Sequence, residues 1–303
     1  MSRQVNFSQG FKPNFSGHET FALRQGWLEK SYQAIVNKDF NPFLAENAIA
    51  EFGVGKNMVN AIKHWALATG FIESSEEKFE PSEYSNLLIG KSLDPYLEKS
   101  DTLWKIHYEL VKNPRNMTLH WLFCYFNDNV FDKSLVSLRL NDFLKTNGLK
   151  LPAEKTLQSD ISVAVATYCQ SKKTPSKDDE VGSPLSELKL IRTTEDGRLT
   201  FNFGPKSSLS DEFLMACIID YWENESIGLN QVINTLKFEQ ILHNPRSPGR
   251  IFLLNERDLA SRLIDIENVS DGGLVWSETT GIQQLQKTQS YNSERLSTKW
   301  MKF

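Results

Sequence analysis

The chain has 303 residues, of which 40% are hydrophobic and 24% are charged, and its formal net charge at pH 7 is -4. This length suits two or three small domains, and the hydrophobic content is ample for a packed core, which excludes a largely disordered chain. The negative charge argues against indiscriminate binding of polyanions, because contacts to phosphate need Lys and Arg. Any surface that binds nucleic acid must therefore be local.

The sequence predicts a cytoplasmic protein without a membrane segment. No apolar stretch approaches the roughly 20 residues that cross a bilayer, and the residues after Met1 lack the apolar core of a signal peptide. The cysteines are few, far apart and embedded in apolar helical patterns, which favours buried free thiols. They are Cys124, Cys169 and Cys217.

Apolar residues at helical spacing predict three helices near the N-terminus, after an extended arm of about a dozen residues. A glycine turn separates the second helix from the third, and two short strands joined by a polar turn follow. The expected elements are helices 27–36, 41–52 and 57–69 and strands 71–73 and 79–81. Three helices followed by a hairpin predict a winged helix-turn-helix.

The middle of the chain is predicted to be helical. Segments 94–111 and 117–126 are amphipathic and rich in aromatic residues, which suits a helical core layer. Segments 134–146 and 154–168 form a second helix-turn-helix unit. This unit is either a second DNA-binding module or an architectural helical hairpin.

Residues 171–182 are the best candidate for a linker, because charged residues and Pro replace apolar residues there. A short hairpin is expected over 191–203, and a helix capped by Ser210 over 211–222. The tail is predicted to repeat a winged-helix order. Its expected elements are a strand at 250–254, a helix at 256–266 and a hairpin within 272–282.

Together these elements predict a mainly α-helical protein with small β-hairpins. We expect an N-terminal arm with a winged helix-turn-helix (1–90), a helical domain (91–170), the linker (171–182) and a C-terminal helical, winged-helix-like domain (183–303).

Segment 49–62 has the features by which helix-turn-helix units close. Ala50 is small enough for two helices to approach, Gly53 permits the turn, and apolar residues at helical spacing bury the inner face. The opposite face presents side chains that can reach base edges or phosphates. They are Lys56, Asn57, Asn60, Lys63 and His64. The pattern predicts contact with double-stranded DNA, and the alternative is a protein-docking or scaffold role.

The run Gly53-Val54-Gly55-Lys56 also resembles a phosphate-binding loop, but it lacks the preceding apolar strand and the Ser or Thr after Lys. We therefore reject nucleotide binding there. The sequence contains no Cys-x-x-Cys metal pattern, no nucleophile elbow and no dinucleotide fingerprint, so the standard enzyme classes are unsupported.

The most unusual polar cluster is a Gly-His-Glu-Thr-Phe run that contains His18 and Glu19, with Arg24 close behind it. A titratable His beside a carboxylate could hold a divalent metal or move a proton. One His and one Glu do not complete a site, so other ligands would have to come from distant segments. Asp94 and Asp160 are candidates, although a cap or a salt-bridge partner is the better interpretation of each. The alternative is a structural role, in which the cluster only holds the N-terminal arm in place.

This run is one of several segments by which the chain resembles the SspB family, the DNA-nicking component of bacterial Ssp DNA phosphorothioation systems in anti-phage defence. The resemblance spans nearly the whole chain, and departures such as Phe52 and Phe71 in place of Leu are minor. The segments are Gly17-His18-Glu19-Thr20-Phe21, Leu23-Arg24, Gly26-Trp27-Leu28, Gly53-Val54-Gly55-Lys56-Asn57-Met58-Val59, Ile62-Lys63, Trp65, Gly70-Phe71-Ile72, Asp94-Pro95-Tyr96-Leu97, Thr102-Leu103-Trp104, Lys155-Thr156-Leu157, Asp160, Ser247-Pro248-Gly249-Arg250 and Thr279-Thr280-Gly281.

The resemblance implies a magnesium-dependent nick, which lets partner proteins replace a non-bridging phosphate oxygen with sulfur. The implied partners are a cysteine desulfurase, an ATP pyrophosphatase of the PAPS reductase type and an ATPase. Mg²⁺ can offset charge on the phosphorane and activate water. His18, Glu19 and Arg24 lie in the family's signature and are the catalytic candidates, with Glu19 as the metal ligand and Arg24 as a phosphate clamp. The alternative is a non-catalytic DNA-binding adaptor or transcriptional regulator of the sulfur-modification machinery.

Overall fold

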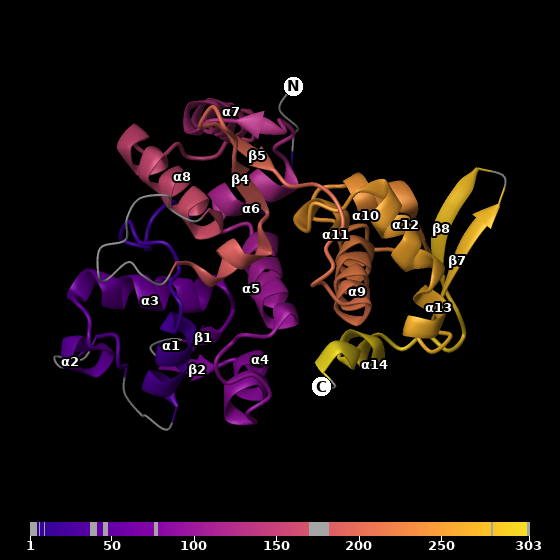
Figure 1. Ribbon diagram of the computed structural model, residues 1–303, viewed down its shortest axis with the longest axis horizontal. Coiled ribbons are helices and arrows are strands. Elements are labelled where there is room, and N and C mark those ends of the chain that lie inside the picture. Colours follow the sequence, from indigo (N-terminus) through magenta and orange to yellow (C-terminus); the bar gives the residue numbers. More distant parts are fainter. Residues whose placement is uncertain are drawn as a thin grey trace. The chain divides into compact units, whose positions relative to one another are not determined.

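A computed structural model describes residues 5, 7–8, 10–36, 41–44, 48–75, 78–169, 182–279 and 281–301 (Figure 1). The chain forms two units, Met1–Asn202 and Phe203–Phe303. About half of the chain is helical, and the strands form small antiparallel sheets, which confirms helices with small hairpins as the basic architecture. None of the helices in the described ranges is long and apolar enough to span a membrane.

The first unit opens with three helices and a hairpin, in the predicted order. Helix α1 buries Trp27, Leu28 and Tyr32 at helical spacing, and it packs against α3. The turn before α3 contains Gly53 with φ of 64°, a left-handed conformation that favours glycine. These elements are α1 (Trp27–Ile35), α2 (Ala48–Phe52), α3 (Lys56–Ala68), β1 (Ile72–Ser75) and β2 (Lys78–Pro81).

The second predicted helix is shorter than expected, because residues 42–44 form a turn and α2 begins at Ala48. Residues 45–47 lie outside the described residues. A winged helix-turn-helix remains a prediction for this part of the chain.

A helical layer follows the hairpin. Helix α6 is buried along its whole length, and α5, α7 and α8 all contact it, so it forms the centre of the first unit. The prediction of a helix from residue 94 is wrong, because α5 begins only at Ser100. The Asp94 carboxylate accepts hydrogen bonds from the N–H groups of Glu98 and Lys99 at 3.0 Å each, and these bonds stabilise a turn before α5. The elements are α4 (Glu83–Ser85), η1 (Asn86–Gly90), α5 (Ser100–Lys112), α6 (Met117–Cys124), α7 (Lys133–Thr146), α8 (Glu154–Tyr168) and η2 (Pro184–Leu188).

The predicted hairpin over 191–203 is confirmed as β4 (Ile191–Thr193) and β5 (Leu199–Phe201), but it is part of a three-stranded antiparallel sheet. The third strand, β3 (Val130–Phe131), pairs with β5 and was not predicted, because two residues are too few to show a periodicity. The first unit therefore extends to Asn202. Of the predicted linker at 171–182, only residue 182 is described, and the division into four domains remains a prediction.

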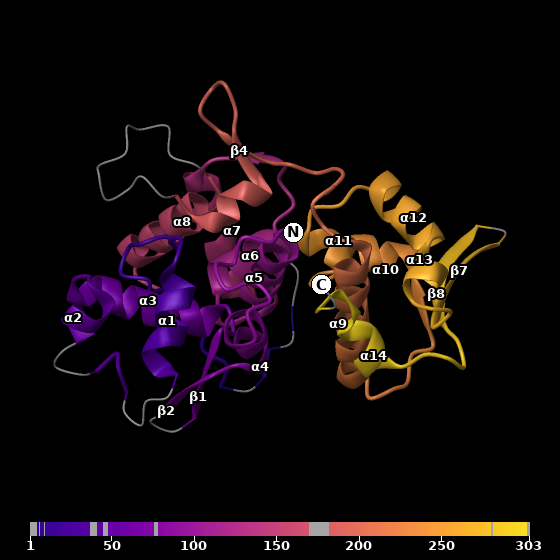
Figure 2. The same ribbon diagram turned by 60° about the horizontal axis from the view of Figure 1, so that its bottom comes forward.

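The second unit is built around α9 (Asp211–Gly228), which is longer than predicted and begins as expected, with the Ser210 hydroxyl accepting the N–H of Phe213 at 3.1 Å. A three-stranded antiparallel sheet in the order β6-β8-β7 lies in the same unit, and Figure 2 shows its strands β7 and β8 side by side. Its other elements are β6 (Thr235–Lys237), α10 (Phe238–His243), α11 (Pro248–Ile251), α12 (Glu256–Ile264), α13 (Ile266–Val269), β7 (Leu274–Thr279), β8 (Ile282–Lys287), α14 (Ser293–Ser297) and η3 (Lys299–Met301).

The predicted strand at 250–254 is wrong, since the segment holds the end of helix α11 and a turn. The Ser247 hydroxyl accepts the N–H of Arg250, and Pro248 occupies the first helical position. Both features favour a helix start over a strand. The third strand of the sheet is β6, which lies earlier in the chain.

Gly249 lies where α11 packs tightly against α10. A Cβ there would lie 2.5 Å from Leu242 Cα and 2.6 Å from the Leu242 carbonyl oxygen, which are backbone atoms. We expect Gly249→Ala to lower the free energy of unfolding by about 1–3 kcal/mol. Gly228→Ala is the matched control, since its Cβ meets nothing within 4 Å. Urea denaturation of both variants measures the difference, and equal stabilities would contradict this packing.

Candidate functional site

Loop 17–21, which carries two of the catalytic candidates, lies just before α1. In Figures 1 and 2 the indigo segment that precedes α1 runs between α3 and α8. On the α8 side, His18 Nε2 lies 2.7 Å from Asp160 Oδ1. On the α3 side, Asn60 Nδ2 donates to Glu19 Oε1 at 3.4 Å, and Trp65 Nε1 donates to the Phe21 carbonyl at 3.1 Å. The loop is therefore tied to both helices.

His18 is buried, and both of its ring nitrogens are engaged. The backbone N–H of Thr20 donates to Nδ1 at 3.1 Å, so Nδ1 accepts a hydrogen bond and the proton resides on Nε2. That Nε2–H donates to Asp160, which is the partner role that the sequence favoured for this carboxylate. The geometry makes His18 an anchor of the loop.

The backbone of the loop adopts uncommon conformations. Glu19 has φ of 48° and Thr20 has φ of 67°, which for residues with a Cβ costs roughly 1–2 kcal/mol each. Hydrogen bonds close the turn, including one from the Phe21 N–H to the His18 carbonyl at 2.8 Å. The result is a tight turn that leaves the side chains of Glu19 and Thr20 exposed. Strain of this kind is concentrated at functional sites.

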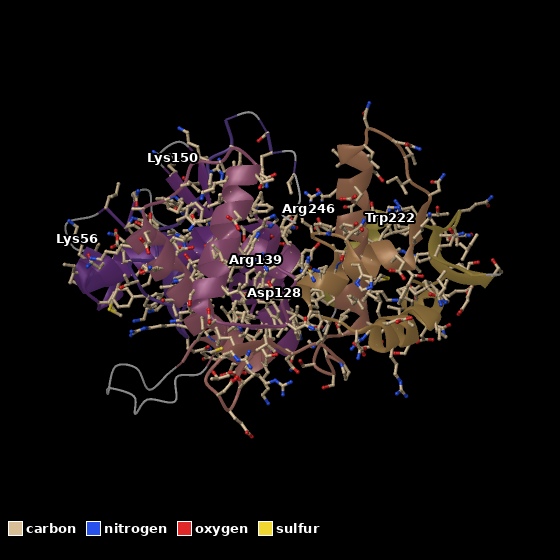
Figure 3. The ribbon with its side chains drawn as sticks, turned by 90° about the horizontal axis from the view of Figure 1, so that it is seen from above. Lys56, Asp128, Arg139, Lys150, Trp222 and Arg246 are labelled. Atoms are coloured by element: carbon tan, nitrogen blue, oxygen red, sulfur yellow. The ribbon has the colours of Figure 1, made fainter. Side chains whose placement is uncertain are left out.

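The outer face of α3 carries most of the predicted DNA-binding residues. Lys56 and Asn57 are exposed, and Asn60 and Lys63 are half-buried. Lys56, Asn60 and Lys63 follow one another at spacings of four and three residues, which puts them on one helix face. In Figure 3, Lys56 lies at the outer edge of the first unit. Because Asn60 also contacts Glu19, this face adjoins the loop.

His64 differs from the other four, because it lines a small cavity beneath the loop. The cavity volume is about 30 Å³, which holds roughly one or two water molecules and excludes a nucleotide. A Cβ at residue 17 would lie 2.7 Å from His64 Nδ1, so Gly17 is what lets the ring approach the loop. Burial, with a smaller electrostatic contribution from the neighbouring His18 side chain, lowers the pKa of His64 from 6.5 to about 4.

Polar residues that the sequence analysis missed also line this cavity. They include Asn14, Asn116 and Thr118. Thr118 Oγ1 is buried and has no hydrogen-bond partner among the described residues. The sequence gives no signal for this role, because Thr118 occupies a position of the apolar helix α6 that is typical of the core.

Arg24 is half-buried at the end of the loop. Its guanidinium carbon lies 5.5 Å from the ring centre of Phe21 and 5.7 Å from that of Trp27, distances that fit cation–π contacts. The two rings hold the side chain next to the start of α1.

The described residues contain no group of three or more His, Cys, Asp or Glu side chains that could hold a metal ion. Mg²⁺ is often held by one or two carboxylates together with water and substrate phosphates. The exposed Glu19 carboxylate fits that donor set when DNA supplies the phosphate oxygens. The prediction of buried thiols is confirmed for Cys124 and Cys217, whereas Cys169 is half-buried.

Comparison with known proteins places these features in a family, since a family model matches residues 15–301. The chain belongs to the family described as "Protein of unknown function (DUF4007)". No curated protein gives a match. Two solved structures are similar to this DUF4007 chain: a magnesium ion-bound SspB crystal structure at 24% identity and an SspB crystal structure at 23% identity. Each has a TM-score of 0.78 and covers 91% of this chain and 83% of the other. The SspB-like fold expected from the sequence is confirmed.

The lowered pKa of His64 predicts a pH-dependent stability. Below pH 6.5 His64 of the unfolded chain is protonated, whereas His64 of the folded protein stays neutral down to about pH 4. The free energy of unfolding therefore decreases as the pH falls from 6.5 to 4. Between pH 7 and pH 5 the loss is at most about 2 kcal/mol. His64→Gln should remove this contribution, which urea denaturation at the two pH values measures. His243→Gln, at an exposed histidine, is the control and should leave the pH dependence in place.

Proposed function

We propose that this protein binds double-stranded DNA and nicks one strand, as a component of an Ssp-type DNA phosphorothioation system in anti-phage defence. The observation that carries the proposal is the contact between Glu19 and Asn60, which puts the candidate metal-binding carboxylate beside the predicted DNA-binding face of α3. The likeness of the fold to SspB supports the same function. A phosphate held near Asn60 and Lys63 would lie close to Glu19.

DNA binding is assigned to α3, as the recognition helix of a winged helix-turn-helix. Lysine ammonium groups supply phosphate contacts, and Asn can pair with adenine edges in the major groove. The hairpin β1–β2 is a poor phosphate-binding wing, because Glu73 and Glu80 are exposed and lie directly opposite each other. The local positive charge of α3 is compatible with the net negative charge of the chain.

The cleavage chemistry requires Mg²⁺, which supplies charge compensation for the reacting phosphate and an activated water when bound. Glu19 would hold the ion, and Asn60 would orient the Glu19 carboxylate. Arg24, pre-oriented by its two aromatic neighbours, would bind a phosphate oxygen. His18 would hold the loop without contact to the DNA.

The partners that we propose follow from the same system. A cysteine desulfurase would supply sulfur, and an ATP pyrophosphatase of the PAPS reductase type together with an ATPase would act on the nicked strand. These proteins would meet the DUF4007 chain in the cytoplasm.

A second candidate function is a non-catalytic DNA-binding adaptor or transcriptional regulator of the sulfur-modification machinery. It is favoured by the engagement of both His18 nitrogens, which leaves no lone pair for proton transfer.

Conversion of supercoiled plasmid to open circles distinguishes the two functions. We expect nicking with Mg²⁺, none with EDTA, and a loss of nicking in Glu19→Gln with unchanged DNA affinity, because the amide keeps the shape and removes the charge that holds the ion. Glu187→Gln is the matched control at another exposed glutamate of the same unit. Supercoiled plasmid throughout, combined with a mobility shift, would refute nicking and support the adaptor.

Lys63→Ala tests the DNA-binding face separately. We expect weaker binding to any duplex sequence, with the slope of log affinity against log salt concentration reduced by about 1, because one phosphate contact is lost. Lys91→Ala removes an exposed lysine after η1 and should leave the slope unchanged. Fluorescence anisotropy at several salt concentrations gives both slopes. Identical slopes for the two variants would contradict the assignment to α3.

A further inference from the structure

The hydrogen bond between His18 and Asp160 is the buried anchor of loop 17–21. Only 6% of His18 and 8% of Asp160 are exposed, and the two residues are 142 positions apart in the chain. A backbone N–H can only donate, so the bond from Thr20 fixes Nδ1 as an acceptor and directs the Nε2–H to Asp160. The ring is therefore held from both sides, by its own loop and by α8.

The orientation of Glu19 depends on this anchor. Glu19 is the next residue in the chain, and it and Thr20 are in left-handed conformations that a free loop would leave. On its other side, the Glu19 carboxylate accepts a hydrogen bond from Asn60, which at 3.4 Å is long for such a bond. The buried bond from His18 to Asp160, at 2.7 Å, is therefore the shorter of the two side-chain contacts, and it ties the closed turn to α8.

We propose that Asp160 is a positioning residue, which acts through His18 to keep the Glu19 carboxylate beside the outer face of α3. This inference rests on the proposed function, because it assigns Asp160 a part in nicking. Asp160 lies too deep to touch DNA, and the adjoining cavity of about 30 Å³ admits no nucleotide. It contributes a hydrogen-bond acceptor of fixed position, so a neutral acceptor of the same shape should replace it.

The test compares Asp160→Asn with Asp160→Ala. The Asn Oδ1 can still accept the His18 Nε2–H, so Asp160→Asn should nick nearly as fast as the unmodified protein and with the same pH profile. Asp160→Ala should nick about 100-fold more slowly, the scale expected for misplacement by about 1 Å, with unchanged DNA affinity. Gln158→Ala, on the exposed face of α8, is the control and should nick normally.

Amide hydrogen exchange gives a readout that does not depend on nicking. In Asp160→Ala the N–H groups of Thr20 and Phe21 should lose protection, and in Asp160→Asn they should keep it, because both bond to His18. If Asp160→Ala does not fold, Asp160→Leu can replace it in the test. Leu is similar in size to Asp and cannot accept a hydrogen bond from His18.

The outcomes separate this inference from the proposed function. No nicking by the unmodified protein would refute the proposed function, whatever the variants do. Unchanged exchange in Asp160→Ala would refute the anchor, whatever the plasmid shows. If Asp160→Asn were as inactive as Asp160→Ala while its exchange stayed normal, the negative charge of Asp160 would be what matters, and positioning would be overturned.

Discussion

The candidate site depends on one buried hydrogen bond, between His18 in the loop before α1 and Asp160 on α8. The position of Asp160 is fixed by the packing of α8 against α7 and the buried helix α6, so the shape of the loop depends on contacts distant in the sequence. Glu19 and Thr20 adopt left-handed conformations that cost free energy, and the contacts of the loop with the rest of the unit help to offset this cost. The position of the exposed Glu19 carboxylate thus depends on the core of the first unit and is not determined by the loop alone.

The sequence predicted elements well where local signals agree. Helix α3 and the capped start of α9 were predicted because apolar spacing, glycine and capping residues all indicate the same structure. The segment at 250–254 was misassigned because its apolar run matches a strand, while Ser247 and Pro248 begin a helix just before it. Strand β3 was missed because its two residues form a strand only through pairing with β5. Non-local pairing leaves no periodic trace in such short segments.

The candidate site shows the same division between local and non-local information. The residue types around His18 and Glu19 could be identified from the sequence, and so could the polar face of α3. The direction in which the His64 side chain points could not be predicted. Neighbouring positions on a helix point about 100° apart, and only the packed loop shows which side is the interior. The choice of Asp160 over Asp94 as the partner of His18 was equally inaccessible, since Asp94 is used to hold the turn before α5. Partner choice depends on tertiary structure.

Charge distribution further limits how DNA could approach. Glu73 and Glu80 lie directly opposite each other on the hairpin, an arrangement that destabilises a strand pair. The same charges repel a phosphate backbone, so a duplex would avoid the hairpin and contact α3 near Lys56 and Lys63. That orientation would bring the DNA backbone toward Asn60, which contacts Glu19. The Glu73–Glu80 pair and the lysines of α3 therefore favour the same docking direction, which would let a chain with a net negative charge bind DNA at one place, as the proposed function requires.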